Sequence, residues 1–291
     1  MNTREYVKNA LRLILLISPL LSTINLSAQN IKPPVNIRNS EQFYLRSDNT
    51  TDSYLIQVCL PDDYDSSGDK YPVMIVLDGD KSTGMARDIA FWLMFREEIE
   101  NIIIVGISYG GDTETWWNKR ARDFTPTFDD KTTFGKFWPQ AGGAKKFISF
   151  LEDELIPVLK QDYHISDEKT GICGFSYGGL LATYILFYRP LLFENYLIVS
   201  PALVWDNNMI MDTELKYSMR SNSLDKKVYL SRSENDPATI VKYPVQDFLD
   251  TLAKRDYFYL KLQTELFEGD SHFSSYPKAF TNGLIYLYKK K

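Results

Sequence analysis

Short apolar runs alternate with helix-like segments along most of the 291 residues. Residues 73–77 and 102–107 are apolar almost throughout, as in strands that a sheet buries on both faces. Residues 145–163 instead repeat an apolar side chain at every fourth position from Phe147 to Leu159, which is typical of an amphipathic helix. Strands that alternate with helices predict parallel β-α-β units. The expected fold class is therefore α/β, with a mostly parallel sheet and helices on both faces.

The remaining segments follow the same alternation. Residues 43–45 and 54–60 are strand-like and flank a turn at 47–50, which predicts an N-terminal antiparallel hairpin. Further strands are predicted at 170–175, 196–199, 228–230 and 259–266, and helices at 85–98, 180–187, 241–254 and 277–288. Composition does not change after residue 41, which indicates one domain over residues 41–291 behind a polar arm at 29–40.

The first 28 residues have the pattern of a secretory signal peptide. Arg4, Lys8 and Arg12 give a basic start, residues 13–21 are mostly apolar, and Ser27-Ala28 offers small residues for cleavage. The apolar run is too short to span a bilayer, which takes about 20 residues. We expect a periplasmic or secreted protein, with 30 basic and 37 acidic residues and a formal charge of −7 after cleavage.

Composition excludes several classes of function. A net charge of −5, a pI near 5.3 and the absence of a basic tract argue against a nucleic-acid binder. No run of about 18 apolar residues follows the signal peptide, so we expect no membrane span after its removal. Two histidines are too few for a multi-histidine metal site, and we predict neither metal nor cofactor. Cys59 and Cys173 lie in apolar strand-like runs, which favours buried free thiols over a disulfide.

The strongest chemical signal is Gly174-Phe175-Ser176-Tyr177-Gly178-Gly179, a G-x-S-x-G motif directly between a predicted strand and a predicted helix. This is the context of a nucleophile elbow, where a strained turn exposes the serine Oγ. Glycines two positions away on either side let the backbone pass closely. The helix that follows directs N–H groups at a developing anion. Ser176 is the predicted nucleophile, and the Tyr177 amide is a predicted oxyanion donor.

A serine nucleophile needs a base, and the chain offers only His164 and His272. His164 precedes the motif, whereas in α/β-hydrolases the base follows the serine. His272 lies between the strand at 259–266 and the last predicted helix, so it is the predicted base and His164 a loop residue. The acid should follow an intervening strand, and both Glu234 and Asp236 follow the strand at 228–230.

A second oxyanion donor is expected in the loop after an earlier strand. Asp78-Gly79-Asp80 follows the strand at 73–77. We predict that Gly79 permits a tight turn there and that the amide of Gly79 or Asp80 points toward the nucleophile.

Residues 109–143 show little periodicity, and a long irregular loop in a compact domain is usually functional. We expect this loop to overhang the nucleophile. Its aromatic side chains suit a catechol or feruloyl ring, and its basic side chains suit an anionic ligand. Alternatively, the aromatic residues pack a small core beneath the loop. The predicted substrate-binding residues are Trp116, Trp117, Arg120, Arg122 and Trp205.

Over residues 41–288 the chain resembles the esterase D-like putative esterase family of the α/β-hydrolase fold, and within it the trilactone (enterobactin-type) siderophore esterases. The matching motifs are Tyr71–Val73, Leu77–Asp80, Arg120, Asp123–Pro126, Gly142-Gly143, Phe147–Pro157, Gly174–Gly178, Ser200–Asp206 and Gly269–His272. At the acid, Arg232-Ser233 replaces the family's usual Val-Gly. Aligned there, Asp236 falls on the family's acidic position and Glu234 two residues before it, so the resemblance favours Asp236.

These features predict an exported serine carboxyl-ester hydrolase that acts through an acyl-enzyme. The resemblance implies small-molecule or oligosaccharide esters as substrates: siderophore-type lactones, or acyl and feruloyl esters of carbohydrates. An acyltransferase with the same three residues would differ only in excluding water from the acyl-enzyme. A non-catalytic ligand-binding protein is the remaining alternative, and the intact Ser176 and His272 argue against it.

Overall fold

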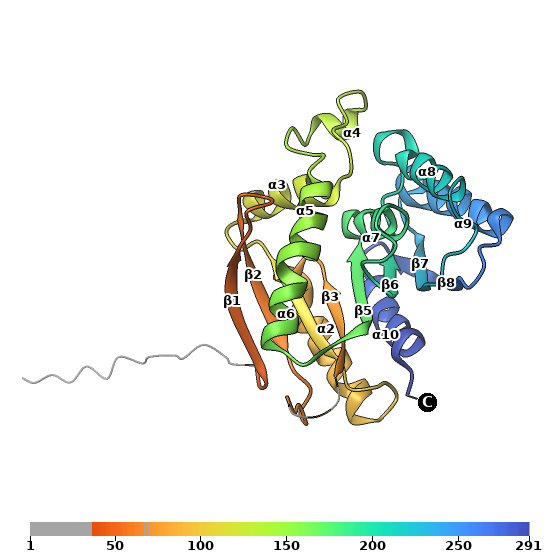
Figure 1. Ribbon diagram of the computed structural model, residues 1–291. Coiled ribbons are helices and arrows are strands. Elements are labelled where there is room, and N and C mark those ends of the chain that lie inside the picture. Colours follow the sequence, from red (N-terminus) through yellow and green to blue (C-terminus); the bar gives the residue numbers. More distant parts are fainter. Residues whose placement is uncertain (1–36, 67, 69, 291) are drawn as a thin grey trace, which may run out of the picture. The chain divides into compact units, whose positions relative to one another are not determined.

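A sheet of eight strands in the order β1-β2-β4-β3-β5-β6-β7-β8 forms the centre of the described chain (Figure 1). The computed structural model describes residues 37–66, 68 and 70–290. The predicted signal peptide and most of the predicted arm lie outside the described residues. The first strand begins at Ser40, inside the range predicted for the arm.

The elements alternate along the chain much as predicted. The strands are β1 (Ser40–Arg46), β2 (Ser53–Cys59), β3 (Tyr71–Val76), β4 (Ile103–Ser108), β5 (Ile165–Phe175), β6 (Asn195–Val199), β7 (Lys227–Asn235) and β8 (Lys261–Ser271). The helices are α2 (Gly79–Phe95), α3 (Thr113–Phe124), α4 (Thr133–Lys136), α5 (Ala144–Ser149), α6 (Ile156–Asp162), α7 (Tyr177–Tyr188), α8 (Trp205–Ser218), α9 (Tyr243–Arg255) and α10 (Ser275–Tyr288). Two π-helical segments, η1 (Phe150–Leu155) and η2 (Ala238–Lys242), lead into α6 and α9.

Strand pairing explains the apolar runs of the sequence. β1 and β2 form the predicted antiparallel hairpin, and β2 also pairs antiparallel with β4. The remaining pairs, from β4-β3 through β3-β5 to β7-β8, are all parallel. All of β4 and β6 and nearly all of β3 are buried, because helices cover both faces of the sheet. Helices α2 and α10 pack on one face, and α5, η1, α6 and α7 pack on the other. This order and layering are those of the α/β-hydrolase fold.

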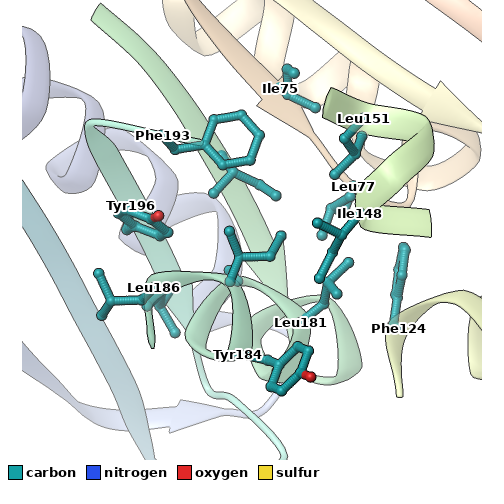
Figure 2. Close-up of a cluster of buried hydrophobic side chains, with 14 of the residues drawn as sticks. Ile75, Leu77, Phe124, Ile148, Leu151, Leu181, Tyr184, Leu186, Phe193 and Tyr196 are labelled. Carbon is teal, nitrogen blue, oxygen red and sulfur yellow. The ribbon is translucent and has the colours of Figure 1, made fainter. Parts of the chain in front are cut away.

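The core fixes the helix that follows the G-x-S-x-G motif. In Figure 2, Leu181 of α7 lies near Ile148 of α5 and near Leu77, the residue that follows β3. Burial of each large apolar side chain contributes about 1.5–3 kcal/mol. Helix α7 is buried along almost its whole length, so the residue at its N-terminus has a fixed position.

The turn after β3 differs from the prediction. The helix begins at Gly79 rather than near residue 85, and it is Asp78 that adopts the left-handed conformation, with φ of 57°. A Cβ on Gly79 would lie 2.5 Å from Ser108 Oγ and 2.8 Å from the carbonyl carbon of Ile107. Glycine is therefore required there for the close approach of α2 to β4 and not for a tight turn.

Residues 109–143 are not an irregular loop, because they contain α3 and α4. Asp112 caps α3 by accepting a hydrogen bond from the Thr115 amide at 2.8 Å. Figure 1 shows α3 and α4 at the end of the sheet toward which the β5 arrow points. Helix α8 was not predicted either, because Asp206, Asn207 and Asn208 have left-handed backbone angles that break its periodicity.

Cys59 and Cys173 are buried free thiols, as predicted. Burial raises the pKa of Cys59 to about 11 and that of Cys173 to about 12. Both side chains are therefore neutral hydrophobic groups of the core at neutral pH.

Candidate active site

Ser176 lies on a strained turn between β5 and α7, with φ of 57° and ψ of −112°. Its amide donates to the Val199 carbonyl at 3.0 Å, and its carbonyl accepts from the Ala202 amide at 3.1 Å, which holds the unfavourable backbone in place. A Cβ on Gly174 would lie 2.1 Å from the Gly178 oxygen, and one on Gly179 would lie 2.9 Å from Pro201 Cβ. The strictly required glycines are therefore Gly174 and Gly179, because a Cβ on Gly178 would make only ordinary contacts.

His272 and Asp236 are in direct contact. His272 Nδ1 lies 2.5 Å from Asp236 Oδ1, and the carboxylate is almost fully buried. The His272 ring centroid lies 4.5 Å from that of Phe175, the residue before Ser176, and His272 and Ser176 line the same two cavities. The imidazole thus has Nδ1 bound to a carboxylate and lines the same cavities as the serine. This arrangement can accept and return a proton.

Asp236 has a complete set of hydrogen bonds on its other oxygen. Oδ2 accepts from Ser200 Oγ at 2.8 Å and from the Ser233 amide at 2.7 Å. Burial alone would raise the pKa of Asp236, but the hydrogen bonds from His272, Ser233 and Ser200 lower it below its ordinary value. The carboxylate is therefore charged at neutral pH and oriented toward His272.

Ser200 is a site residue to which the sequence analysis gave no role. It is fully buried, has φ of 43°, and its amide donates to the Ser231 carbonyl at 2.7 Å. This backbone geometry aims its hydroxyl at Asp236. The signal in the sequence was Ser200-Pro201 directly after an apolar strand, although nothing there indicates the partner.

The other candidates for acid and base lie elsewhere. Glu234 is part of the exposed end of β7, where its carboxylate accepts from the Gly269 amide at 2.8 Å and joins the ends of β7 and β8. His164 precedes β5, whereas Ser176 follows it. The strand has 11 residues, so the two lie at opposite ends of β5.

Two helix N-termini meet at the predicted oxyanion site. Tyr177 is the first residue of α7, and Gly79 and Asp80 begin α2. The two helix starts lie side by side, since a Cβ on Gly178 would be only 3.6 Å from Asp78 Oδ2. Amides in the first turn of a helix lack intrahelical acceptors and favour negative charge. The Asp80 carboxylate is used otherwise, since it accepts from the amides of Tyr109 and Gly110 at 2.7 and 2.9 Å.

Arg120 is buried and connects the elbow to the start of α2. Its Nε donates to Asp78 Oδ1 at 2.6 Å, and an Nη donates to the Phe175 carbonyl at 3.0 Å. Burial raises the pKa of Asp78, and the guanidinium opposes that shift. Arg120 therefore joins the residue before the nucleophile to the residue before the predicted oxyanion donors of α2.

Two cavities of about 390 and 270 Å³ meet at Ser176 and His272. Both include Trp117 and Arg120, which were predicted to bind substrate, and the smaller one includes Trp116. Trp117 stacks on Trp138 with centroids 5.7 Å apart, so part of the 109–143 segment forms a cavity wall. Phe124 of the same segment joins the buried core, which is the alternative that the sequence left open.

Two predicted substrate-binding residues do not line either cavity. Arg122 donates to Asp52 and Asp123 at 2.7–3.0 Å and thereby ties α3 to the start of β2. Trp205 is buried behind Tyr177 and donates from Nε1 to the Thr127 carbonyl at 3.1 Å. Both side chains have structural partners that the sequence did not reveal, and the prediction for them is corrected.

Within residues 37–66, 68 and 70–290, no helix has the length and apolar character that crossing a membrane requires. In that same part of the chain, no three His, Cys, Asp or Glu side chains are grouped as ligands for a metal ion.

The family model described as "Putative esterase" matches residues 47–286. The chain belongs to this esterase family. Ferri-bacillibactin esterase BesA of Bacillus subtilis is 32% identical over 178 residues, which are 59% of this chain and 58% of that protein. Siderophore triacetylfusarinine C esterase of Aspergillus fumigatus is 31% identical over 190 residues, 61% of each chain. The chain thus matches about three-fifths of the length of each of these esterases.

A solved structure of similar shape is that of the BES protein from Bacillus cereus, with a TM-score of 0.79 and 26% identity. The match covers 89% of this chain and 99% of that one. The family and the fold agree with the resemblance that the sequence motifs indicate.

Proposed function

We propose that this esterase-family protein is a serine carboxyl-ester hydrolase. The observation that carries the proposal is the buried Asp236–His272 contact beside a serine on a strained elbow, with Ser176 and His272 at one cavity. Ser176 Oγ attacks the ester carbonyl carbon while His272 Nε2 takes its proton. The negative oxygen that forms accepts hydrogen bonds from the amides of Tyr177 and of Gly79 or Asp80.

Collapse of this intermediate breaks the ester C–O bond. The leaving alkoxide takes the proton from His272 and departs as the alcohol, which leaves the acyl group on Ser176. Water then attacks the acyl-enzyme, again with His272 as base, and releases the acid. Asp236 keeps Nδ1 protonated throughout and stabilises the imidazolium.

Siderophore-type esters are the substrates we propose. Relatives named as siderophore esterases support this class, and so do the aromatic cavity walls formed by Trp117, Phe137 and Trp138. The purified protein should be assayed with an iron-free and an iron-loaded catecholate trilactone, a feruloylated oligosaccharide and p-nitrophenyl acetate. We expect the highest kcat/KM for a trilactone.

Other results would contradict this proposal in distinct ways. Preference for the feruloylated oligosaccharide would replace the substrate class. Transfer to an added alcohol that outpaces hydrolysis would indicate an acyltransferase. Binding of a trilactone without turnover would indicate a ligand-binding protein.

We also propose export, on the pattern of residues 1–28. Fractionation of cells that express the full chain should place it outside the cytoplasm, and deletion of residues 2–28 should retain it inside. An unchanged location after the deletion would contradict export through this segment.

A further inference from the structure

The two cavities beside Ser176 differ in charge. The larger one has apolar walls beyond the shared residues, among them Phe137, Pro237, Ile240 and Val241. The smaller one adds Asp78, Lys81, Ser82 and Tyr276 to aromatic walls. An ester has two sides around its carbonyl, so a nucleophile placed between two cavities directs one side into each. This step depends on the proposed function.

Lys81 is the cation that remains available in the smaller cavity. Arg120, the other cationic residue of its wall, is buried and committed to Asp78 and to the Phe175 carbonyl. Lys81 is exposed, forms no ion pair with any residue of the described chain, and has its Nζ 5.7 Å from the Trp116 ring centroid. Among the side chains that line this cavity, the carboxylate of Asp78 is paired with Arg120, and Lys81 is the charged group that has no ion-pair partner in the described chain.

Two of the basic residues that the sequence offered for an anionic ligand are engaged elsewhere. Lys119 and Arg122 both bind Asp52, at 2.9 Å each. Lys81 comes instead from the first turn of α2, directly after the predicted oxyanion donors. In the sequence, Lys81 is therefore next to the residues whose amides are predicted to bind the reacting carbonyl oxygen.

We propose that the smaller cavity binds an anionic group of the ester substrate, a carboxylate or a phenolate, with Lys81 as its cationic contact. The larger cavity takes the uncharged apolar or aromatic part on the other side of the carbonyl. Lys81 is thus a specificity-determining residue of this site.

The test uses matched esters that differ by one charge. One pair carries the charge on the leaving group, 3-carboxyphenyl butyrate against 3-carbamoylphenyl butyrate, and the other carries it on the acyl group, a phenyl hemisuccinate against the phenyl succinamate. The ratio of kcat/KM for the anionic ester to that for the neutral one is measured for wild type, Lys81→Gln, Lys81→Arg and Lys254→Gln. Lys254 is exposed on α9, so its variant makes the same change in net charge away from the cavities.

We expect Lys81→Gln to lower the ratio about fivefold in one of the two pairs, as for loss of a partly exposed ion pair. Lys81→Arg and Lys254→Gln should both leave the ratio unchanged. In wild type, added salt should lower the ratio only for the ester pair that responds to Lys81→Gln. An unchanged ratio in both pairs for Lys81→Gln would overturn the inference, and so would an equal fall in Lys254→Gln. If wild type hydrolyses none of the four esters, the proposed function fails first, and the inference with it.

Discussion

Replacement of Asp236 by asparagine changes one atom and reverses the polarity of its contact with His272. In the protein, Oδ2 accepts hydrogen bonds from Ser200 and Ser233, and Oδ1 lies 2.5 Å from His272 Nδ1. An asparagine would keep its carbonyl oxygen toward the two donors, because one of them, the Ser233 amide, is part of the backbone and can only donate. Its NH₂ group would then face Nδ1.

The magnitude follows from the tautomer that this contact imposes. An NH₂ group facing Nδ1 makes that nitrogen an acceptor, which moves the imidazole proton to Nε2 on the side of Ser176. A protonated Nε2 is not a base, and the imidazolium also loses its carboxylate. The same substitution in the serine-protease triad lowers kcat about 10⁴-fold. We expect a loss of about 10³–10⁴-fold here, or roughly 4–5.5 kcal/mol in the barrier.

The assay is the pH dependence of kcat/KM for p-nitrophenyl acetate in wild type, Asp236→Asn and Glu234→Gln. Glu234→Gln is the matched control, since its amide oxygen can still accept from Gly269. The control should retain activity within about threefold. A crippled Glu234→Gln beside an active Asp236→Asn would refute the reasoning.

Four further outcomes follow from the same contacts. Ser200→Ala should lower kcat about tenfold with little change in KM, since it removes one of the two donors to Asp236 Oδ2, and a change in KM alone would contradict this role. Gly174→Ala should prevent soluble expression, because its Cβ would lie 2.1 Å from a backbone oxygen; a normal thermal transition would argue against this packing. Cys59 and Cys173 should resist iodoacetamide at pH 8 until the protein unfolds, and fast alkylation of the native protein would contradict their burial. The hydrogen bonds that lower the pKa of Asp236 stabilise the fold above the ordinary pKa of an aspartate, and that contribution fades as pH falls through the lower folded pKa; the gap between the urea midpoints of wild type and Asp236→Asn should therefore shrink in acid, whereas a constant gap would contradict the shift.

The strands of the parallel sheet could be predicted from the sequence because the pattern of apolar residues reflects which faces of a strand are buried. β3, β4 and β6 are covered on both faces and therefore read as continuous apolar runs. The elements it missed have physical reasons. Helix α8 contains three left-handed residues, and α3 has a polar surface and places Trp116 and Trp117 side by side, so neither shows a clear apolar stripe.

In the candidate site, too, some residues could be predicted from the sequence and others could not. Ser176 and His272 could be predicted from a motif and from the small number of histidines. Whether Asp236 or Glu234 contacts His272 depends on where β7 ends, since Glu234 remains in the strand and Asp236 follows it. Side-chain partners across the fold, such as Ser200 with Asp236 and Arg122 with Asp52, leave no pattern in the sequence.

The most direct test of the central claim is the mass of the protein during turnover. Rapid quench of wild type with p-nitrophenyl acetate, followed by intact-mass and peptide analysis, should show one added acetyl group on the peptide that contains Ser176. The adduct should be absent from Ser176→Ala and should accumulate less in His272→Ala. Steady turnover by Ser176→Ala at the wild-type rate, or an acetyl group on another residue that is lost at the rate of turnover, would contradict the account.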